Sequence, residues 1–223
     1  MTKKGIFLLF SFFLLGSNML NIVEKSINEN NSNIEINVVY PYFESNNNLK
    51  AVDKINKIVD DDLKLWISDL KDLSNNEQFN YNNPKDNIIK FELDTDYKIG
   101  LNKENLLSFY IDYYQYTGGN HGITTRRSYN FDLKSGKQFK LKHMFKKGYD
   151  YKSIINSEIK KQINENPQYY FNNGNEFKGI SKNQDFYLTD DSIVIYFQLY
   201  EIAPYSSGIR EFKIPLSLLK DGM

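Results

Sequence analysis

The chain has 223 residues, of which 40% are hydrophobic and 25% are charged, a composition typical of a globular protein with a buried core. That length fits one large domain or two small ones. The 28 basic and 28 acidic residues balance, which argues against nucleic acid as a partner, because phosphate binding needs a basic surplus on one face. Cysteine is absent, so disulfides, thiolate zinc sites and cysteine nucleophiles are excluded. With only two histidines, we expect neither a metal nor a cofactor.

The N-terminal segment, residues 1–23, has the pattern of an export signal. Lys3 and Lys4 precede a stretch of Phe and Leu without charge, as in a signal peptide. Its apolar core of about ten residues is shorter than the roughly 20 needed to cross a bilayer. If the uncharged stretch is counted to Val23, it could instead stay as a membrane anchor. We therefore expect an extracytoplasmic protein, secreted or anchored, that meets the membrane only through this segment; a buried first helix is the less favoured alternative.

The next part of the chain predicts strands around one long helix. Residues 24–33 are polar and Asn-rich, which favours a tether. Residues 49–73 place apolar side chains three or four positions apart, as on the buried stripe of a helix, with Asn48 as its N-cap. Alternating apolar and polar residues predict strands at 34–40, 88–100, 106–116 and 124–133. We expect Pro41 to end the first of these strands.

The C-terminal half predicts a second helix followed by short strands. Residues 150–163 carry isoleucines on one side of a helix. The remaining elements are a hairpin at 186–188 and 193–199, a strand at 209–214 and a short terminal helix at 215–220. This order favours an α+β fold with antiparallel sheets and a long helix in each half packed on one face.

A glycine-dense segment at residues 116–122 is the most distinctive candidate for a site. Its glycines permit positive φ and close backbone approach, which could cradle an anion or present His121 to a ligand. A phosphate-binding loop is excluded, because neither its Lys-Ser/Thr pair nor a following helix is present. The alternative, which we favour, is a hairpin end whose glycines serve turn geometry and whose histidine packs or caps.

Two acidic clusters, Asp60–Asp62 and Asp190–Asp191, could in principle ligate a divalent cation. Neither has the spacing of a calcium loop. The first lies inside a predicted helix, where adjacent positions face different ways, and the second lies in a predicted turn. A Gly-x-Ser-x-Gly nucleophile motif is absent, and one sequence does not identify paired carboxylates for glycoside cleavage. We assign no catalytic residue and no metal ligand.

Tyrosine is abundant, and four of the 17 tyrosines crowd the strand at residues 106–116. Exposed tyrosines offer rigid amphipathic area to glycans or proteins. Because side chains alternate along a strand, Tyr110, Tyr114 and Tyr116 share one face and Tyr113 takes the other. Core packing accounts for half of them, and which face is exposed stays open.

Two segments resemble a bacterial extracytoplasmic module. The first joins residues 116–122 to the strand and turn at 129–137, and the second covers residues 196–209 and closes with Phe212-Lys213-Ile214-Pro215. Together they resemble the C-terminal domain of the RsiV type, a domain of unknown function, preceded by the accessory domain found ahead of some peptidoglycan deacetylase domains. The resemblance covers about residues 34–219 and assigns the accessory part to 34–116 and the RsiV-like part to 117–223.

The resemblance implies an α+β fold, an extracytoplasmic location and, in the anti-sigma members, binding of lysozyme that triggers proteolysis of the membrane anchor. Because only four residues precede the apolar segment and no catalytic domain follows the module, we expect a lone, non-catalytic binding module. Its ligand would be a lysozyme-like protein or a cell-wall glycan such as peptidoglycan. The alternative is an envelope polymer hydrolase that uses His121 and carboxylates. The candidate binding residues are Tyr116, Gly118, Gly119, His121, Tyr200, Glu201 and Tyr205.

Overall fold

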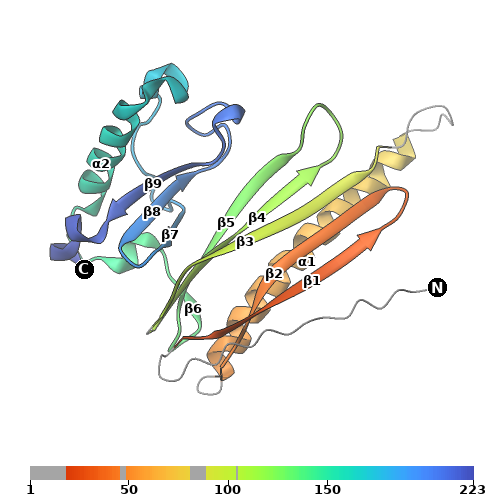
Figure 1. Cartoon of the computed structure of the whole chain (residues 1–223), viewed down its shortest axis with the longest axis horizontal. Helices are drawn as coiled ribbons and strands as arrows, with labels where there is room; N and C mark the ends of the chain where they lie inside the picture. Colours follow the sequence, from red (N-terminus) through yellow and green to blue (C-terminus); the bar gives the residue numbers. More distant parts are fainter. Residues whose placement is uncertain (1–18, 46–48, 81–88, 104) are drawn as a thin grey trace.

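The computed structural model describes residues 19–45, 49–80, 89–103 and 105–223. Figure 1 shows a large sheet with one helix across its face and a smaller sheet with a second helix beside it. The strands are β1 (Asn21–Asn30), β2 (Ile34–Glu44), β3 (Phe91–Lys103), β4 (Leu106–Tyr116), β5 (Ile123–Asp132), β6 (Lys137–Gln138), β7 (Phe186–Leu188), β8 (Ser192–Phe197) and β9 (Arg210–Pro215). The helices are α1 (Leu49–Asn80) and α2 (Tyr151–Glu165), with 3-10 turns η1 (Leu141–Met144), η2 (Pro167–Tyr169), η3 (Phe171–Gly174), η4 (Tyr205–Ser207), η5 (Leu216–Leu218) and η6 (Lys220–Gly222).

The sheet topology confirms the predicted α+β class. Within the described residues, the large sheet has the order β1-β2-β3-β4-β5-β6 and the small sheet has the order β7-β8-β9. Neighbouring strands are antiparallel except β2 and β3, which run parallel where residues 34–37 face 91–94. A parallel pair needs a crossover connection, and α1 lies in that connection. The expectation of wholly antiparallel sheets is therefore wrong at this pair.

The segment predicted as a tether is an edge strand. β1 pairs antiparallel with β2 along its whole length, from Asn21 opposite Glu44 to Asn30 opposite Glu35. Its side chains are mostly exposed or half-buried on both faces, so the apolar alternation that identifies a strand is weak there. Leu20, just before it, is buried. Residues 20–23 thus belong to the fold, and residues 1–18 of the predicted export signal lie outside the described residues.

The large sheet extends past the predicted boundary between subdomains, after Tyr116. β5 lies beyond that boundary and pairs with β4 along its length, so the large sheet continues to Gln138. Phe131 of β5 is fully buried in the same hydrophobic core as residues from β2 and α1. The β4–β5 hairpin therefore holds residues on both sides of the predicted boundary in one sheet.

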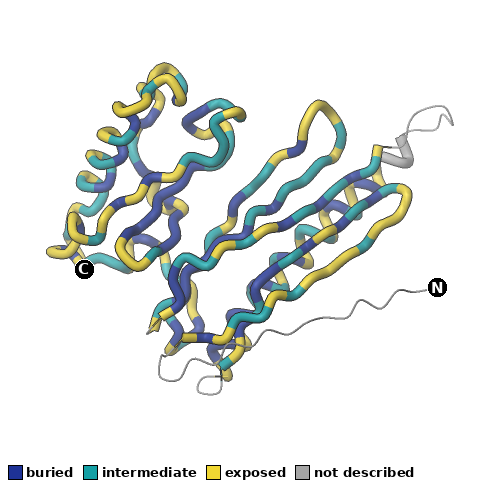
Figure 2. Tube along the Cα trace, viewed as in Figure 1, coloured by how far each residue is buried: buried dark blue, intermediate teal, exposed yellow. Residues whose placement is uncertain are grey.

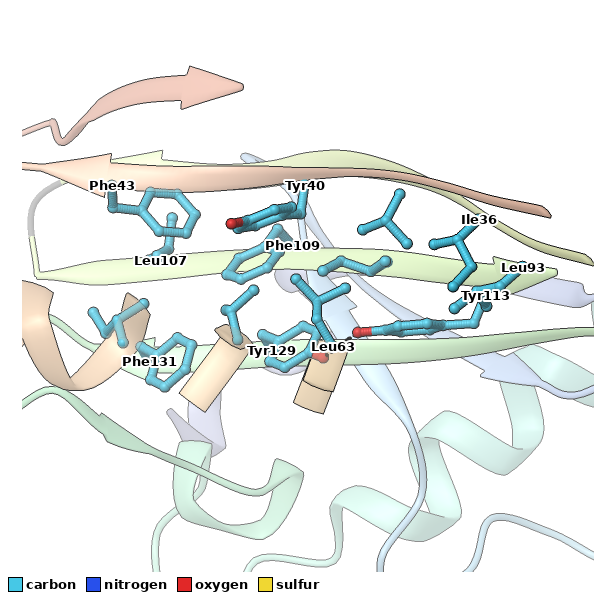
Figure 3. Packing of buried hydrophobic residues seen from close by; sticks show 14 of the residues in the cluster. Ile36, Tyr40, Phe43, Leu63, Leu93, Leu107, Phe109, Tyr113, Tyr129 and Phe131 are labelled. Carbon is cyan, nitrogen blue, oxygen red and sulfur yellow. Dashed lines mark hydrogen bonds between the residues drawn. The ribbon is translucent and has the colours of Figure 1, made fainter. Parts of the chain in front are cut away.

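The core of the large region lies between the sheet and α1. Leu63 of α1 packs in the same cluster as Ile36, Phe109 and Phe131 from the strands (Figure 3). Phe109 stacks on Tyr129 with ring centroids 4.8 Å apart. The predicted apolar stripe of the helix is confirmed, and α1 continues beyond residue 73 to Asn80. No helix in the described part of the chain is both long and apolar enough to cross a membrane.

A second core lies between the small sheet and α2. Ile155, Ile159 and Ile163 of α2 are buried against a cluster that includes Ile195 and Phe212 of the small sheet. Asp150 caps this helix by accepting a hydrogen bond from the Ser153 N–H. Opposite the helix, every residue of β7 and β8 is buried. In Figure 2, dark blue buried segments accordingly appear in both the large and the small sheet. The long helix predicted for each half is thus confirmed, each packed on one sheet.

β2 continues through Pro41 to Glu44, although proline was expected to end it. The Thr95 hydroxyl of β3 accepts the Val39 N–H at 2.8 Å and donates to the Val39 carbonyl at 2.7 Å. The main-chain groups of Val39 therefore face β3, and so do those of Pro41, two positions further along the strand. The parallel ladder with β3 ends at Asn37. The main-chain nitrogen of Pro41 therefore points toward β3 at a position beyond the end of that ladder. No hydrogen bond is lost there, so the strand tolerates the proline.

Candidate functional site

The two sheets meet at a buried arginine. Arg126 of β5 is 9% exposed and pairs with both oxygens of Asp112 at 2.7 Å, and also with Glu211 of β9. Its guanidinium lies 3.6 Å from the centroid of the Tyr110 ring. Burial alone lowers the pKa of Arg126, but the bonds and charges of Asp112 and Glu211 outweigh it and raise the pKa above its usual range. We call these four residues the sheet junction.

β6 pairs with the outer edge of β5 only at residues 131 and 132, and nearer its start this edge is bonded by a side chain. The Gln198 side chain donates to the Arg126 carbonyl at 2.7 Å and accepts the Arg126 N–H at 3.0 Å. Asn130 donates to the Phe186 carbonyl at 2.8 Å. An open strand edge presents unpaired main-chain groups, so these contacts both satisfy the edge and attach the small sheet to it.

Close approach of β7 depends on one serine and one glycine. Buried Ser108 Oγ accepts the Leu188 N–H at 2.7 Å and donates to Asn130 Oδ1 at 2.7 Å. A Cβ at Gly100 would lie 2.2 Å from the Leu188 carbonyl oxygen, so a larger residue there would push β7 away. This network fixes the position of the small sheet relative to the large one.

The two segments that the sequence motifs singled out meet in space. The His121 ring stacks on the Tyr205 ring with centroids 4.1 Å apart. The Gly122 carbonyl oxygen accepts hydrogen bonds from His121 Nδ1 at 2.9 Å and from the Tyr205 hydroxyl at 3.0 Å. The Tyr200 ring lies 5.7 Å from that of Tyr205 and is 50% exposed. We call His121, Tyr200 and Tyr205 the aromatic tip; beside it the β4–β5 turn is largely exposed (Figure 2).

The turn that carries Tyr200 is held in an unusual conformation. Tyr200 has a φ of 65°, in the left-handed region that non-glycine residues seldom occupy. Glu201 Oε2 accepts the Gln198 N–H at 2.9 Å, so it closes this turn. Desolvation raises the pKa of Glu201, and the bond from Gln198 opposes that rise. Of the two adjacent candidates, the structure therefore gives Glu201 a positioning contact and leaves the Tyr200 ring available.

Turn geometry and packing account for the glycines of the segment. Gly118 and Gly119 have φ values of 103° and 93°, and the Tyr116 hydroxyl donates to the Gly119 carbonyl at 3.0 Å. A Cβ at buried Gly122 would lie 2.5 Å from the Tyr114 ring. The favoured interpretation of the segment as a hairpin end thus agrees with the geometry. His121 is one of several exposed residues of this turn, beside Asn120 and Ile123.

The tyrosine-rich strand divides between its two faces as expected. Tyr113 is fully buried, stacks on Trp66 with centroids 4.6 Å apart and shares a hydrogen bond of 2.9 Å with Tyr129. Burial raises the pKa of Tyr113 to about 12. On the other face Tyr110 lies in the sheet junction, and Tyr114 is half-buried.

The acidic clusters are engaged in ion pairs with basic side chains. Asp61 pairs with Lys57 at 2.7 Å along α1, and Asp62 pairs with Arg127 at 2.9 Å. Asp190 pairs with Lys103 at 2.8 Å. Within the described ranges, His, Asp and Glu side chains form no group of three or more that could hold a metal ion.

One feature that the sequence analysis missed is a cavity of about 500 Å³ beside η4. Arg210 donates to the Ser207 carbonyl at 3.1 Å and to the Tyr170 hydroxyl at 2.9 Å. These residues lie up to 40 positions apart, so no local motif could indicate the cavity. We call it the η4 cavity; its lining includes Asn166, Tyr169, Tyr170, Ser207, Arg210 and Glu211.

Comparison with protein families divides the chain much as the structure does. Residues 27–124 match the family described as "Deacetylase PdaC", and residues 142–217 match "Protein of unknown function (DUF3298)". The first match begins within β1 and ends at the start of β5, and the second covers α2 and the whole small sheet. Each region of the chain therefore has its own family match.

Two curated proteins of Bacillus subtilis are similar to parts of the chain. The peptidoglycan-N-acetylmuramic acid deacetylase PdaC is 26% identical over 134 residues, which cover 58% of this chain and 29% of PdaC. The anti-sigma-V factor RsiV is 32% identical over 142 residues, which cover 54% of this chain and 50% of RsiV. The matches thus span half or less of each relative.

Two solved structures share the fold over nearly the whole chain. A DUF3298 family member from Bacteroides fragilis has a TM-score of 0.71 at 21% identity, covering 93% of this chain and 95% of that one. A DUF3298 family protein from Pseudomonas aeruginosa has a TM-score of 0.58 at 18% identity, covering 91% and 92%. The matches confirm the resemblance predicted from the two motifs: this chain contains an RsiV-like DUF3298 domain preceded by a PdaC-like N-terminal domain.

Proposed function

We propose that the protein is an extracytoplasmic, non-catalytic binding module of the cell envelope that engages its ligand through the aromatic tip. The ligand is a lysozyme-like protein or a peptidoglycan strand. The observation that carries the proposal is the stack of His121 on Tyr205, which joins two motifs 84 positions apart (205 − 121) at an exposed site.

The composition of the tip supports a role in binding. Tyr200 and Ile123 are each 50% exposed, although large side chains of this kind gain free energy when they leave water. Aromatic residues supply rigid contact area at low entropic cost and are enriched among the residues that dominate binding energies. The left-handed φ of Tyr200 adds a second reason, because strained backbone is found preferentially at functional positions.

The similarities support the location and the class of ligand. One similar protein is named as a peptidoglycan deacetylase and the other as an anti-sigma factor, and the resemblance to the RsiV type implies an envelope setting with lysozyme as a ligand. This chain spans only 29% and 50% of those two proteins, so their complete activities do not transfer to it.

The surroundings of His121 favour binding over hydrolysis. Its described contacts are the Tyr205 ring and the Gly122 carbonyl, and in the part of the chain that the structure describes no carboxylate bonds to it. The Gly122 carbonyl fixes the orientation of the ring, but it carries no charge that would strengthen the imidazole as a general base, as a carboxylate partner would. We therefore keep the envelope polymer hydrolase as the alternative, and loss of a measured hydrolytic activity in a folded His121→Ala variant would support it.

The test is a calorimetric titration of the protein with lysozyme and, separately, with solubilised peptidoglycan fragments. We expect saturable binding to one of them, weakened about tenfold or more in Tyr200→Gly, which removes the exposed ring from a site where glycine suits the backbone. Leu65→Ala is the matched control, because Leu65 is 53% exposed on α1, away from the tip. Failure of the wild-type protein to bind either ligand, or equal binding by Tyr200→Gly, would contradict the proposal.

A further inference from the structure

The three arginines of the chain differ in what neutralises them. Arg126 pairs with Asp112 and Glu211, and Arg127 pairs with Asp62. Arg210 forms no ion pair with any residue that the structure describes; its two hydrogen bonds go to the Ser207 carbonyl and the Tyr170 hydroxyl, both uncharged. Its Nε is buried and has no hydrogen-bond partner in the described structure. The guanidinium also lies 4.8 Å from the centroid of the Tyr170 ring, a cation–π contact that leaves its charge without a counter-ion. A half-buried guanidinium without a carboxylate is costly unless an anion neutralises it.

Tyr170 adds a second unsatisfied donor at the same place. Its side chain is 7% exposed, and its hydroxyl oxygen accepts from Arg210 Nη2 at 2.9 Å. The hydroxyl hydrogen finds no acceptor among the described residues. Both groups line the η4 cavity, so a cation and an O–H donor converge where the protein supplies no anion. A fork of this kind suits a carboxylate, which accepts several charge-assisted bonds at once.

The acidic groups of the cavity do not meet this need. Glu211 directs one oxygen to Arg126 and the other to the Tyr187 hydroxyl, so it belongs to the sheet junction. Glu165 is exposed on the cavity lining and, in the described structure, makes no hydrogen bond or ion pair with Arg210. Its free oxygens, like the amide of Asn166, suit the hydroxyl and N–H groups of a polar ligand.

The aromatic wall indicates the rest of the ligand. The Tyr169 ring is 51% exposed at the cavity, whereas Tyr170 stacks on Phe212 with centroids 6.0 Å apart. A flat, exposed tyrosine offers an apolar face to a sugar ring. The volume of about 500 Å³ falls within the range of small-molecule sites.

We propose that the η4 cavity binds a saccharide that carries a carboxylate, with Arg210 and Tyr170 on the carboxylate and Tyr169 against the sugar ring. This rests on the proposed function in one respect, the envelope glycan as a source of such sugars. η4 itself begins with Tyr205 of the aromatic tip and ends at Ser207 in the cavity, so the two sites share one turn.

The test is an NMR titration of the full chain with three probes. N-acetylmuramic acid carries both sugar and carboxylate, N-acetylglucosamine carries the sugar alone, and D-alanyl-D-alanine carries a carboxylate without a sugar. We expect N-acetylmuramic acid to bind about tenfold or more tighter than either of the others, since a charge-assisted bidentate contact is worth that much. Arg210→Gln should remove this preference, and Tyr169→Ala should weaken both sugars alike.

Arg127→Gln is the control, because Arg127 is a half-exposed arginine outside the cavity. Equal binding of N-acetylmuramic acid and N-acetylglucosamine, tighter binding of the dipeptide, or no saturable binding would each overturn the inference. If Arg210→Gln fails to fold, Tyr169→Ala still tests the site, because that ring is exposed. Lysozyme is a protein without N-acetylmuramic acid, so its titration with the Arg210→Gln variant reports on the tip alone, and a failure at the cavity is separable from a failure at the tip.

Discussion

The sheet junction and the η4 cavity each contain an arginine that lies over a tyrosine ring, but only the arginine of the junction is paired with carboxylates. Arg126 is nearly buried, and its guanidinium is enclosed by Asp112, Glu211 and the Tyr110 ring. Arg210, at the start of β9, bonds only neutral oxygens and keeps a buried N–H without a partner. The two sites are adjacent, because Glu211, which pairs with Arg126, follows Arg210 directly in β9.

We infer from this difference that the sheet junction stabilises the fold and that the η4 cavity binds a ligand. Where every charge is neutralised inside the protein, removal of one partner should damage the fold, because the others remain buried and unpaired. Where donors lack acceptors, removal should cost little stability and should reduce ligand binding instead. The following four predictions test that division, from the largest expected change to the smallest.

Arg126→Leu should destabilise the protein by about 3 kcal/mol, because it leaves Asp112 and Glu211 without a counter-charge at the junction. Urea unfolding monitored by circular dichroism measures the change. Arg210→Gln serves as the comparison and should change the free energy of unfolding by less than about 0.5 kcal/mol. Equal losses in the two variants would show that the division is wrong.

Ser108→Ala should cost about 2 kcal/mol, because the buried Leu188 N–H loses its acceptor and Asn130 loses a donor. The same urea titration applies. Ser68→Ala, on the exposed side of α1, should have an effect near zero. A neutral Ser108→Ala would mean that β7 is held mainly by apolar packing.

Tyr200→Gly should change stability by less than about 1 kcal/mol, because relief of the left-handed backbone and the greater freedom of glycine in the unfolded chain offset each other. Thermal unfolding of the variant checks this. A large loss of stability would show that the Tyr200 ring supports the fold, and the aromatic tip would then lose its clearest binding residue.

The smallest effect concerns the turn between β5 and β6. The side-chain and main-chain bonds from Ser135 hold the pKa of Asp132 below its ordinary value of 3.8. A lowered folded-state pKa adds stability above the unfolded-state pKa, and this stability is lost as the pH falls through the folded-state pKa. The urea midpoint of the wild type should therefore exceed that of Asp132→Asn at pH 6. The two midpoints should approach each other as the pH falls through the folded-state pKa of Asp132, below 3.8. A difference that stays constant with pH would contradict this.

The sequence predicted elements that carry a strong local pattern. The apolar stripe of α1, the isoleucines of α2 and the alternation in β4 each lie within one segment, so their periodicity was sufficient. β1 was missed because both of its faces are largely exposed and its stability comes from main-chain pairing with β2. The end of β2 was misplaced because the effect of Pro41 depends on where the β3 ladder stops.

The candidate sites show the same limit. The motifs identified His121 and Tyr205 separately, but only the fold places their rings 4.1 Å apart. Arg210 and Tyr170 carried no signal at all, because their contact joins β9 to the loop after α2. The binding role of Glu201 stays a prediction, and only the fold shows that its carboxylate accepts the Gln198 N–H within its own turn.

The central claim is that the ligand contacts the aromatic tip and not the sheet junction. Hydrogen–deuterium exchange of the protein with and without its saturating ligand, lysozyme or peptidoglycan fragments, tests this directly. We predict new protection at residues 118–123 and 199–207, with exchange in β7 and in the β4 segment around Asp112 unchanged. Protection confined to the junction strands, or none in either tip segment, would contradict the account.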